Sequence, residues 1–216
     1  MKSYTDLYSR SENQTLESVE QRYSWFNREL REFTRKFSAA FPNYWGILTF
    51  IAHEFCGTTR VQLMTILDKS GSQTDVKNLL NALRATIKFE NKLYEDLRKE
   101  YQQYINQPGV TKKNKDDFGD KDDEEYLEEQ YRIEQIPKIK GSISNCFEMH
   151  MKPYVDTEES ELRDGIIKEL MSDFEDPEKN SLQSEDLAIL NSSLIMFTKI
   201  KHLLKRASTL SRTQTM

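Results

Sequence analysis

Residues 16–40 read LESVEQRYSWFNRELREFTRKFSAA, and this stretch decides the fold. Its apolar side chains recur alternately three and four positions apart, a repeat of 3.5 residues: Leu16, Val19, Tyr23, Phe26, Leu30, Phe33, Phe37 and Ala40. Such a repeat is typical of a helix that lies along another helix through a single seam. We therefore predict a helix over residues 13–40, ended by Pro42, and we call the first seven of these side chains the seam.

The partner of the seam is open at this point. Within the chain, the seam could pack against the next two helices; between chains, it could form a coiled coil with another protein. The seven residues Leu16, Val19, Tyr23, Phe26, Leu30, Phe33 and Phe37 are therefore a candidate interface for a partner helix. The strict 3.5-residue repeat favours the coiled coil between chains, and packing within the chain remains the alternative.

The rest of the chain is also expected to be helical. Only 7 glycines and 5 prolines occur in 216 residues, which leaves few turns for an all-β or α/β fold. Apolar periodicity and capping residues predict further helices at 44–69, 75–106, a short one before Pro137, then 139–152, 158–174 and 185–207. The predicted fold is all-α, an elongated antiparallel helical bundle or coiled coil of about six to seven helices.

The predicted division into domains follows one acidic, polar segment. Residues 107–123 hold many charges and few apolar groups, so they predict a flexible linker. This linker would separate a three-helix region with the seam, residues 1–106, from a second helical region, residues 124–216.

Composition excludes several classes of protein. The net charge of −5 argues against nucleic acid as the main partner. No run of eighteen apolar residues predicts a membrane-spanning helix, and the start shows no signal peptide. Cys56 and Cys146 both stand in apolar helical settings, which predicts buried free thiols in a reducing compartment.

The sequence motifs give little support for a catalytic site or a metal site. His53 with Cys56, and Cys146 with His150, could each share a helix face and together offer four zinc ligands. However, there is no Cys-x-x-Cys pair, no His-Glu-x-x-His motif, no phosphate-binding loop and no nucleophile elbow. We expect neither catalytic residues nor a cofactor nor a metal.

Four charged residues stand within otherwise apolar helices. If the second and third helices pack antiparallel, Arg60 could face Glu90, or Glu54 could face Arg84. Such pairs could fix the register of the two helices, or they could form a binding site for a partner.

The C-terminal end is basic. No acid follows Asp186, whereas Lys199, Lys201, Lys205, Arg206 and Arg212 follow it. These cations could complement the negative end of a helix dipole, or they could contact anionic lipid or an acidic partner.

Five short motifs occur in one order along the chain. They are Arg22-Tyr23-Ser24-Trp25; Phe41-Pro42-Asn43-Tyr44-Trp45; Glu54-Phe55-Cys56 with Thr58-Thr59-Arg60; Arg84-Ala85-Thr86-Ile87-Lys88-Phe89-Glu90; and Ser142 to Glu148 followed by His150. In kind and order they resemble the Vps-fifty-three family, a subunit family of the Golgi-associated retrograde protein (GARP) complex. The resemblance covers roughly residues 20 to 165.

The resemblance implies a vesicle tether and not an enzyme. It implies a non-catalytic subunit, peripheral on the cytosolic face of the trans-Golgi network and endosomes, that assembles with other GARP subunits through helices. SNARE proteins and small GTPases are further partners that it implies, and longer family members imply that this chain is a fragment. The alternatives are a related tether (exocyst or the conserved oligomeric Golgi complex), a membrane-surface module or a GTPase-regulating module.

Overall fold

The computed structural model describes residues 2–8, 14–37, 40–41, 45–70, 75–106, 132–175, 181–184 and 187–210. The chain divides into two compact units, Met1–His150 and Met151–Met216. The first unit holds α1 (Lys2–Tyr8), the 3₁₀ helix η2 (Leu16–Ser18), α2 (Val19–Phe37), α3 (Ile47–Ser70), α4 (Val76–Ile105), a helix over 132–138 and the 3₁₀ helix η5 (Ser144–His150). The second holds α6 (Lys152–Glu175), β1 (Ser181–Ser184), β2 (Leu187–Leu190) and α7 (Asn191–Leu210). The predicted all-α class is confirmed, with one small hairpin added.

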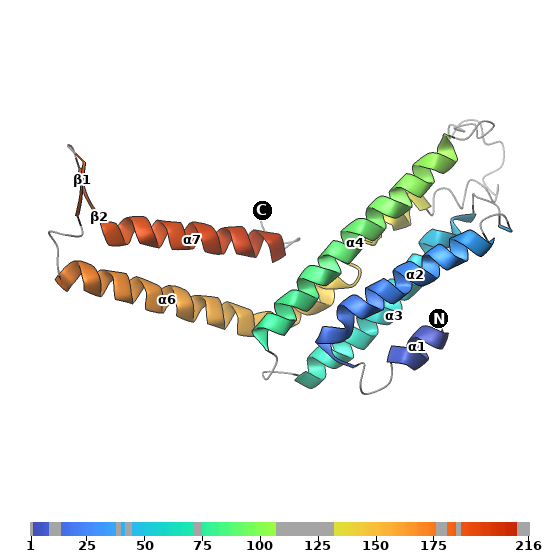
Figure 1. The fold of residues 1–216 in the computed structure, drawn as a ribbon, viewed down its shortest axis with the longest axis horizontal. Helices are drawn as coiled ribbons and strands as arrows, with labels where there is room; N and C mark the ends of the chain where they lie inside the picture. Colours follow the sequence, from blue (N-terminus) through green and yellow to red (C-terminus); the bar gives the residue numbers. More distant parts are fainter. Residues whose placement is uncertain are drawn as a thin grey trace. The chain divides into compact units, whose positions relative to one another are not determined.

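The three long helices of the first unit follow the predicted order and direction. Figure 1 shows α3 running opposite to α2 and α4. The start of α4 is also as predicted, because the Asp75 carboxylate accepts a hydrogen bond from the Lys77 N–H at 3.1 Å and caps the helix. Helix α2 ends at Phe37, three residues before the predicted end, and Pro42 lies outside the described residues.

The core of the first unit is aromatic and lies where α2, α3 and α4 meet. The Phe26 ring stacks on Phe55 with ring centroids 4.0 Å apart, and Tyr23 stacks on Phe89 at 4.2 Å. Tyr4 of α1, for which the sequence predicted no element, is fully buried against Phe55 at 5.0 Å. Rings of this kind bury much apolar surface in defined geometries, so they fix how the helices pack.

The boundary between the two units differs from the predicted one. The structure divides the chain after His150, whereas the sequence predicted the division at 107–123. Residues 132–150 belong to the first unit because Ile136, Ile139, Ile143 and Phe147 are buried in it. The predicted linker itself lies outside the described residues.

The predicted helix at 139–152 is wrong. Turns occupy residues 139–143 and η5 follows, because the N–H groups of Gly141, Ile143 and Ser144 donate to the Glu90 carboxylate. Donors held by a side chain cannot form the i to i−4 bonds of an α-helix. Gly141 has φ +84°, a conformation that glycine adopts without strain.

The short helix predicted to end before Pro137 continues to residue 138. A proline in the last turn removes only one hydrogen bond, so it does not have to end the helix before its own position.

The second unit differs most from prediction. Helix α6 begins at Lys152, with Pro153 in its first turn, where the missing amide donor costs little. The predicted cap, Thr157, therefore lies inside the helix, where its hydroxyl donates to the Pro153 carbonyl at 2.8 Å. In place of a helix from 185, β1 pairs antiparallel with β2 before α7 starts at Asn191.

Candidate interaction surface on helix α2

The seam divides into two halves with different surroundings. Leu16, Val19, Tyr23 and Phe26 are buried, the last three with 1%, 4% and 2% of their surface exposed. Leu30 and Phe33 are half-buried, and Phe37 is 45% exposed. The N-terminal half therefore packs within the first unit, and the C-terminal half leaves apolar surface open.

The open half continues into a larger aromatic surface. Phe41, Trp45 and Phe50 are 36%, 38% and 57% exposed. The Phe33 ring lies 5.3 Å from Phe37 and 6.1 Å from Phe41, and Phe41 lies 6.0 Å from Trp45. We call Leu30, Phe33, Phe37, Phe41, Trp45 and Phe50 the aromatic surface.

A groove of about 480 Å³ lies on this surface between α2 and α3. Its walls are formed by Trp25, Phe26, Glu29, Leu30, Glu32, Phe33, Lys36, Phe37, Phe50, Ile51 and Glu54. Three of its charged residues are acids and one is a lysine. Exposed apolar grooves with a polar rim mark interaction sites on soluble proteins.

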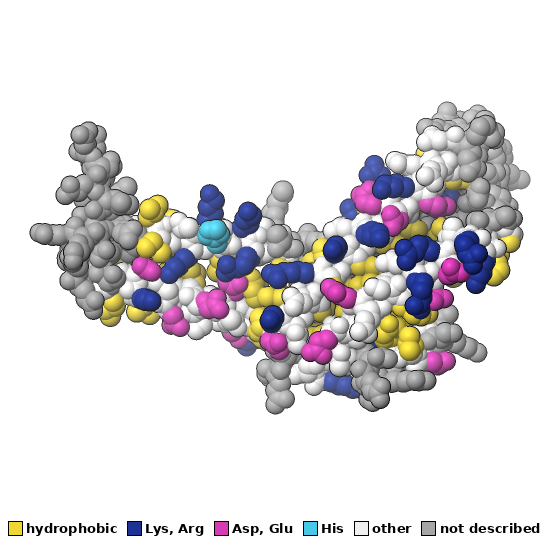
Figure 2. Space-filling model, viewed as in Figure 1, with side chains coloured by type: hydrophobic (Ala, Val, Ile, Leu, Met, Phe, Trp, Pro, Cys, Tyr) yellow, Lys and Arg dark blue, Asp and Glu magenta, His cyan; other side chains and the backbone are white. Residues whose placement is uncertain are grey.

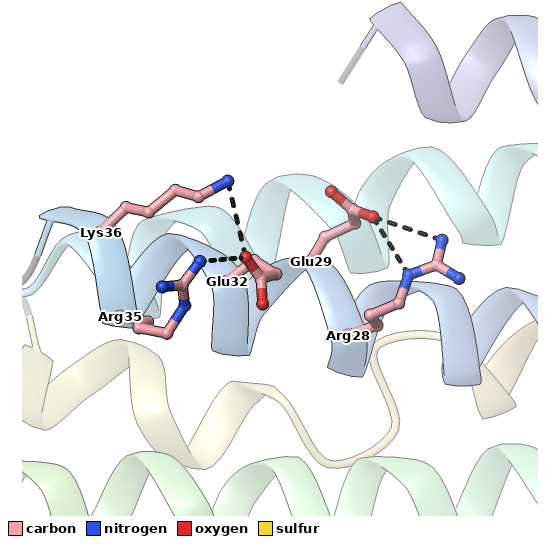
Figure 3. Close-up of polar contacts among 5 residues, drawn as sticks. All are labelled: Arg28, Glu29, Glu32, Arg35 and Lys36. Atoms are coloured by element: carbon pink, nitrogen blue, oxygen red, sulfur yellow. Dashed lines mark hydrogen bonds and ion pairs between the residues drawn. The ribbon is translucent and has the colours of Figure 1, made fainter.

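Charged pairs follow α2 beside the groove (Figure 3). Glu32 accepts from Arg35 at 2.9 Å and lies 3.5 Å from the Lys36 ammonium, while Arg28 and Glu29 are 3.3 Å apart. The hydrogen bond from Arg35, followed by the contact with Lys36, lowers the pKa of Glu32. These pairs are exposed, so they add little stability. The space-filling view shows basic and acidic side chains interspersed over the outer face of α2 (Figure 2).

The four charged residues singled out by the sequence are placed differently from one another. Glu54, Arg60 and Arg84 are exposed, whereas Glu90 is fully buried. Neither of the two predicted pairs is among the ion pairs that the structure records for the described residues. The described residues therefore show no ion pair between these residues of α3 and α4, and Glu90 makes a different contact.

Glu90, the last residue of the fourth motif, binds the start of the fifth motif and the glycine before it. Its Oε1 accepts from the N–H groups of Ile143 and Ser144 at 2.6 and 2.9 Å, and its Oε2 from the Gly141 N–H at 3.0 Å and the Ser144 hydroxyl at 2.7 Å. A buried carboxylate needs several donors to offset its lost hydration. The apolar line of α4 is interrupted at this residue because the carboxylate binds the turn before η5.

Other motif residues are buried around this contact. The hydroxyl groups of Tyr23 and Thr86 lie 2.7 Å apart, and those of Tyr4 and Thr59 also 2.7 Å. Burial raises the pKa of Tyr23 well above its usual value, and it raises the pKa of the Cys56 and Cys146 thiols to about 12. These residues therefore stay neutral and stabilise the core.

Two arginines are buried with their partners. Arg22 donates to the Tyr4 hydroxyl at 3.4 Å and to Gln62, and its guanidinium lies 4.6 Å from the Tyr8 ring centre. Arg132 donates to Glu100 at 2.5 Å and stands against Gly46, where an added Cβ would lie 2.5 Å from the Arg132 Cδ. Nothing in the spacing of the sequence revealed that these two cations are buried.

The potential zinc ligands have other partners. His53 Nε2 lies 2.9 Å from the Gln135 carbonyl oxygen, and His150 Nε2 lies 3.4 Å from Asp68. Both cysteines are buried free thiols. Over the part of the chain that the structure describes, no three His, Cys, Asp or Glu side chains are grouped to hold a metal ion.

Two basic side chains of the C-terminal helix α7 form ion pairs within the second unit. Arg206 donates to Glu158 at 2.5 and 3.1 Å, and Lys199 lies 3.5 Å from Glu169. The hydrogen bond from Arg206 lowers the pKa of Glu158. These contacts hold α7 against α6.

An aromatic helical core, a buried carboxylate that binds the backbone and an open apolar groove define the first unit as a helical scaffold. None of the described helices is both long and apolar enough to cross a bilayer. The model of the Vps53 N-terminal family matches residues 1–175, so the chain belongs to the Vps53 family.

Relatives with this name occur in a plant and in an animal. Vacuolar protein sorting-associated protein 53 A of Arabidopsis thaliana is 29% identical over 242 residues, covering 99% of this chain and 28% of that protein. Its paralogue 53 B is 26% identical over 77% of this chain and 26% of its own length. The Caenorhabditis elegans homologue is 34% identical over 42% of this chain and 12% of its own length. The chain therefore spans about a quarter of the plant relatives. No solved structure matches it.

Proposed function

We propose that this chain forms the N-terminal assembly part of a non-catalytic GARP subunit, which tethers vesicles in endosome-to-Golgi retrograde transport. Membership of the Vps53 family and the names of the relatives, which refer to vacuolar protein sorting, support this proposal. The observation that carries it is the aromatic surface, because the sequence continues the seam for two turns beyond the point where the chain's own helices cover it.

The groove would accept one helix of a sister subunit. An amphipathic helix places apolar side chains in such a groove at positions i, i+3, i+4 and i+7. Leu30, Phe33 and Phe37 would supply the matching side chains from α2. Glu54 on the rim would favour a basic residue on the partner helix, whereas Glu29 and Glu32 already lie beside basic residues of α2.

The complex would act at the cytosolic face of the trans-Golgi network and of endosomes. In this role the chain holds sister subunits together, while SNARE proteins and small GTPases bind elsewhere in the assembly. The working parts are surfaces, so no catalytic residue is proposed.

Co-expression with the other three GARP subunits, followed by pull-down and sizing, tests the proposal. The informative variant is Phe33→Asp with Phe37→Asp, which places two charges in the groove. Val61→Asp with Met64→Asp is the matched control, because these α3 residues are apolar and 64% and 38% exposed but do not line the groove. Phe26→Asp is unsuitable, because Phe26 is buried and its loss would unfold the first unit.

Stoichiometric recovery of the wild-type chain and of the α3 control, with loss in the α2 variant, is the expected result. Equal recovery of both variants would show that sister subunits do not bind the groove. A wild-type chain that is folded by circular dichroism but recovers no sister subunit would contradict the assembly role of this part of the protein.

A further inference from the structure

Helix α7 has two faces with different partners. One face carries Lys199 and Arg206, which pair with acids of α6. The opposite face carries Leu194, Phe197, Lys201, Leu204 and Ser208, which are three or four positions apart and therefore lie in one line. We call this line the outer stripe of α7. It is about 15 Å long from residue 194 to residue 204 at 1.5 Å per residue.

The outer stripe is open and apolar. Leu194, Phe197 and Leu204 are 53%, 65% and 61% exposed. Leu194 also lines the groove between α6 and α7, whereas Phe197 and Leu204 do not. Tyr154 is the one buried apolar side chain among the described residues of the second unit. This face is therefore available for a contact outside the pair.

The lysines on and beside the stripe indicate which kind of surface could bind it. Lys201 and Lys205 are exposed, and neither forms an ion pair with a described residue. Residues 191–210 contain no acid, so these two lysines would be complemented best by a surface that is itself negatively charged. Lys201 also stands between Phe197 and Leu204 in the middle of the apolar line.

A lysine in this place fits a lipid surface better than a protein core. Burying an ammonium group in a protein interface is costly unless an acid meets it. At a membrane, the lysine stem lies along the acyl chains and its ammonium reaches the headgroups. Short helices with Phe and Leu on one side and Lys beside them lie in the plane of anionic membranes.

We propose that the outer stripe of α7 binds anionic lipid headgroups, with Phe197 and Leu204 inserted among the acyl chains and Lys201 and Lys205 on the phosphates. The proposal goes beyond assembly with sister subunits and does not depend on it. It gives the chain a direct contact with the membrane. With few apolar anchors and two exposed cations, this contact would be weak and reversible, and several copies or subunits would strengthen it.

Sedimentation with vesicles tests the proposal on the full 216-residue chain. Phosphatidylcholine vesicles with and without phosphatidylserine are compared, first at low salt and then at about 1 M salt, where the Debye length is about 3 Å. We expect binding only with phosphatidylserine, and loss of binding at high salt.

The first comparison is between two charge-reversal variants. Lys201→Glu with Lys205→Glu is expected to weaken binding by at least about tenfold, because each cation near an anionic surface contributes to attraction. Lys88→Glu with Lys92→Glu is the control. These two lysines are exposed on α4 with the same spacing of four residues and the same change in net charge. A control that weakens binding as much would overturn the assignment to α7.

A fluorescent reporter supplies a second, independent reading. Both native thiols are buried with pKa values raised to about 12, so a cysteine introduced by Ser208→Cys reacts selectively with an environment-sensitive dye. A blue shift on addition of phosphatidylserine vesicles is expected at this position. It is not expected for Met149→Cys, which is 88% exposed in the first unit.

Three results would overturn the proposal. They are equal binding to vesicles without phosphatidylserine, absence of binding by a chain that circular dichroism shows to be folded, and full binding by the Lys201 and Lys205 variant. Loss of sister-subunit recovery in that variant, with vesicle binding intact, would assign the stripe to an acidic protein partner instead. Because the Phe33 and Phe37 variant is not expected to change vesicle binding, failure here and failure of the proposed function remain distinguishable.

Discussion

The two halves of the α2 seam have the same spacing but different environments. Val19, Tyr23 and Phe26 are buried among α3 and α4, whereas Leu30 and Phe33 are half-buried and Phe37 is 45% exposed. The repeat shows which side chains lie on one line of the helix. What covers each part of that line depends on the neighbouring helices, and the described ones cover its N-terminal part fully and its C-terminal part incompletely.

The difference predicts a larger role in stability for the covered half, and the proposed function assigns assembly to the open half. Side chains in the covered half hold the first unit together, so their loss should unfold it. Side chains in the open half contribute little to folding, and they remain available to a partner. A set of substitutions along α2 and its contacts can test this division. Both tryptophans, Trp25 and Trp45, lie in the first unit, so their fluorescence during urea unfolding reports on that unit.

The largest effect is expected for Phe26→Ala. Phe26 is 2% exposed and stacks on Phe55, so truncation leaves a cavity in the aromatic core. We expect a loss of about 3–5 kcal/mol in the free energy of unfolding, measured by urea titration. A loss below about 1 kcal/mol would show that the core can close around the site, and it would remove the contrast between the halves.

Glu90→Gln is expected to have the next largest effect. The amide keeps one acceptor oxygen but presents an N–H₂ group to donors that now bind the carboxylate. We expect a loss of about 2–4 kcal/mol in the free energy of unfolding, because charge-assisted bonds to a buried group are replaced by an unsatisfied contact. Glu54→Gln on α3 is the control, because Glu54 is exposed and should change little.

Tyr23→Phe should have a smaller effect. It removes only the hydroxyl that lies 2.7 Å from the Thr86 hydroxyl, and the ring still stacks on Phe89. The expected loss is about 1 kcal/mol. A double-mutant cycle with Thr86→Val measures the coupling, and a coupling near zero would show that this hydrogen bond does not contribute to stability.

The smallest effect is expected for Phe37→Ala, in the open half. Its ring is 45% exposed, so the change should alter the free energy of unfolding by no more than about 0.5 kcal/mol. Urea unfolding of this variant beside Phe26→Ala gives the comparison in one experiment. A large loss at Phe37 would place the whole seam in the chain's own core and would leave the groove without a free apolar wall.

Much of the helical architecture was predictable from the sequence. The start of α4 at the Asp75 cap follows from local preferences, as does the antiparallel order of α2, α3 and α4. Local preference failed where a distant residue competes for the backbone. Glu90 accepts hydrogen bonds from the N–H groups of Gly141, Ile143 and Ser144, more than fifty positions away in the chain. The predicted helix there becomes a turn followed by a 3₁₀ helix.

The candidate site was predictable only in part. The periodicity of α2 identified Leu30, Phe33 and Phe37 as members of an interface, but it gave Leu16 to Phe26 the same role. The seam did not include Phe41, Trp45 or Phe50, which complete the aromatic surface. Exposure is a property of the assembled helices, so spacing within one helix cannot separate a covered side chain from an open one.

The sequence by itself determined the helical class, the family and the line of apolar side chains along α2. Helix geometry depends on residues a few positions apart, and the family motifs are strings of neighbouring residues, so both are visible without a structure. The tertiary structure alone decided that Glu90 binds the turn before η5, that Arg22 and Arg132 are buried, and that the seam is open beyond Phe26. These features depend on contacts between residues far apart in the chain, and only folding brings such residues together.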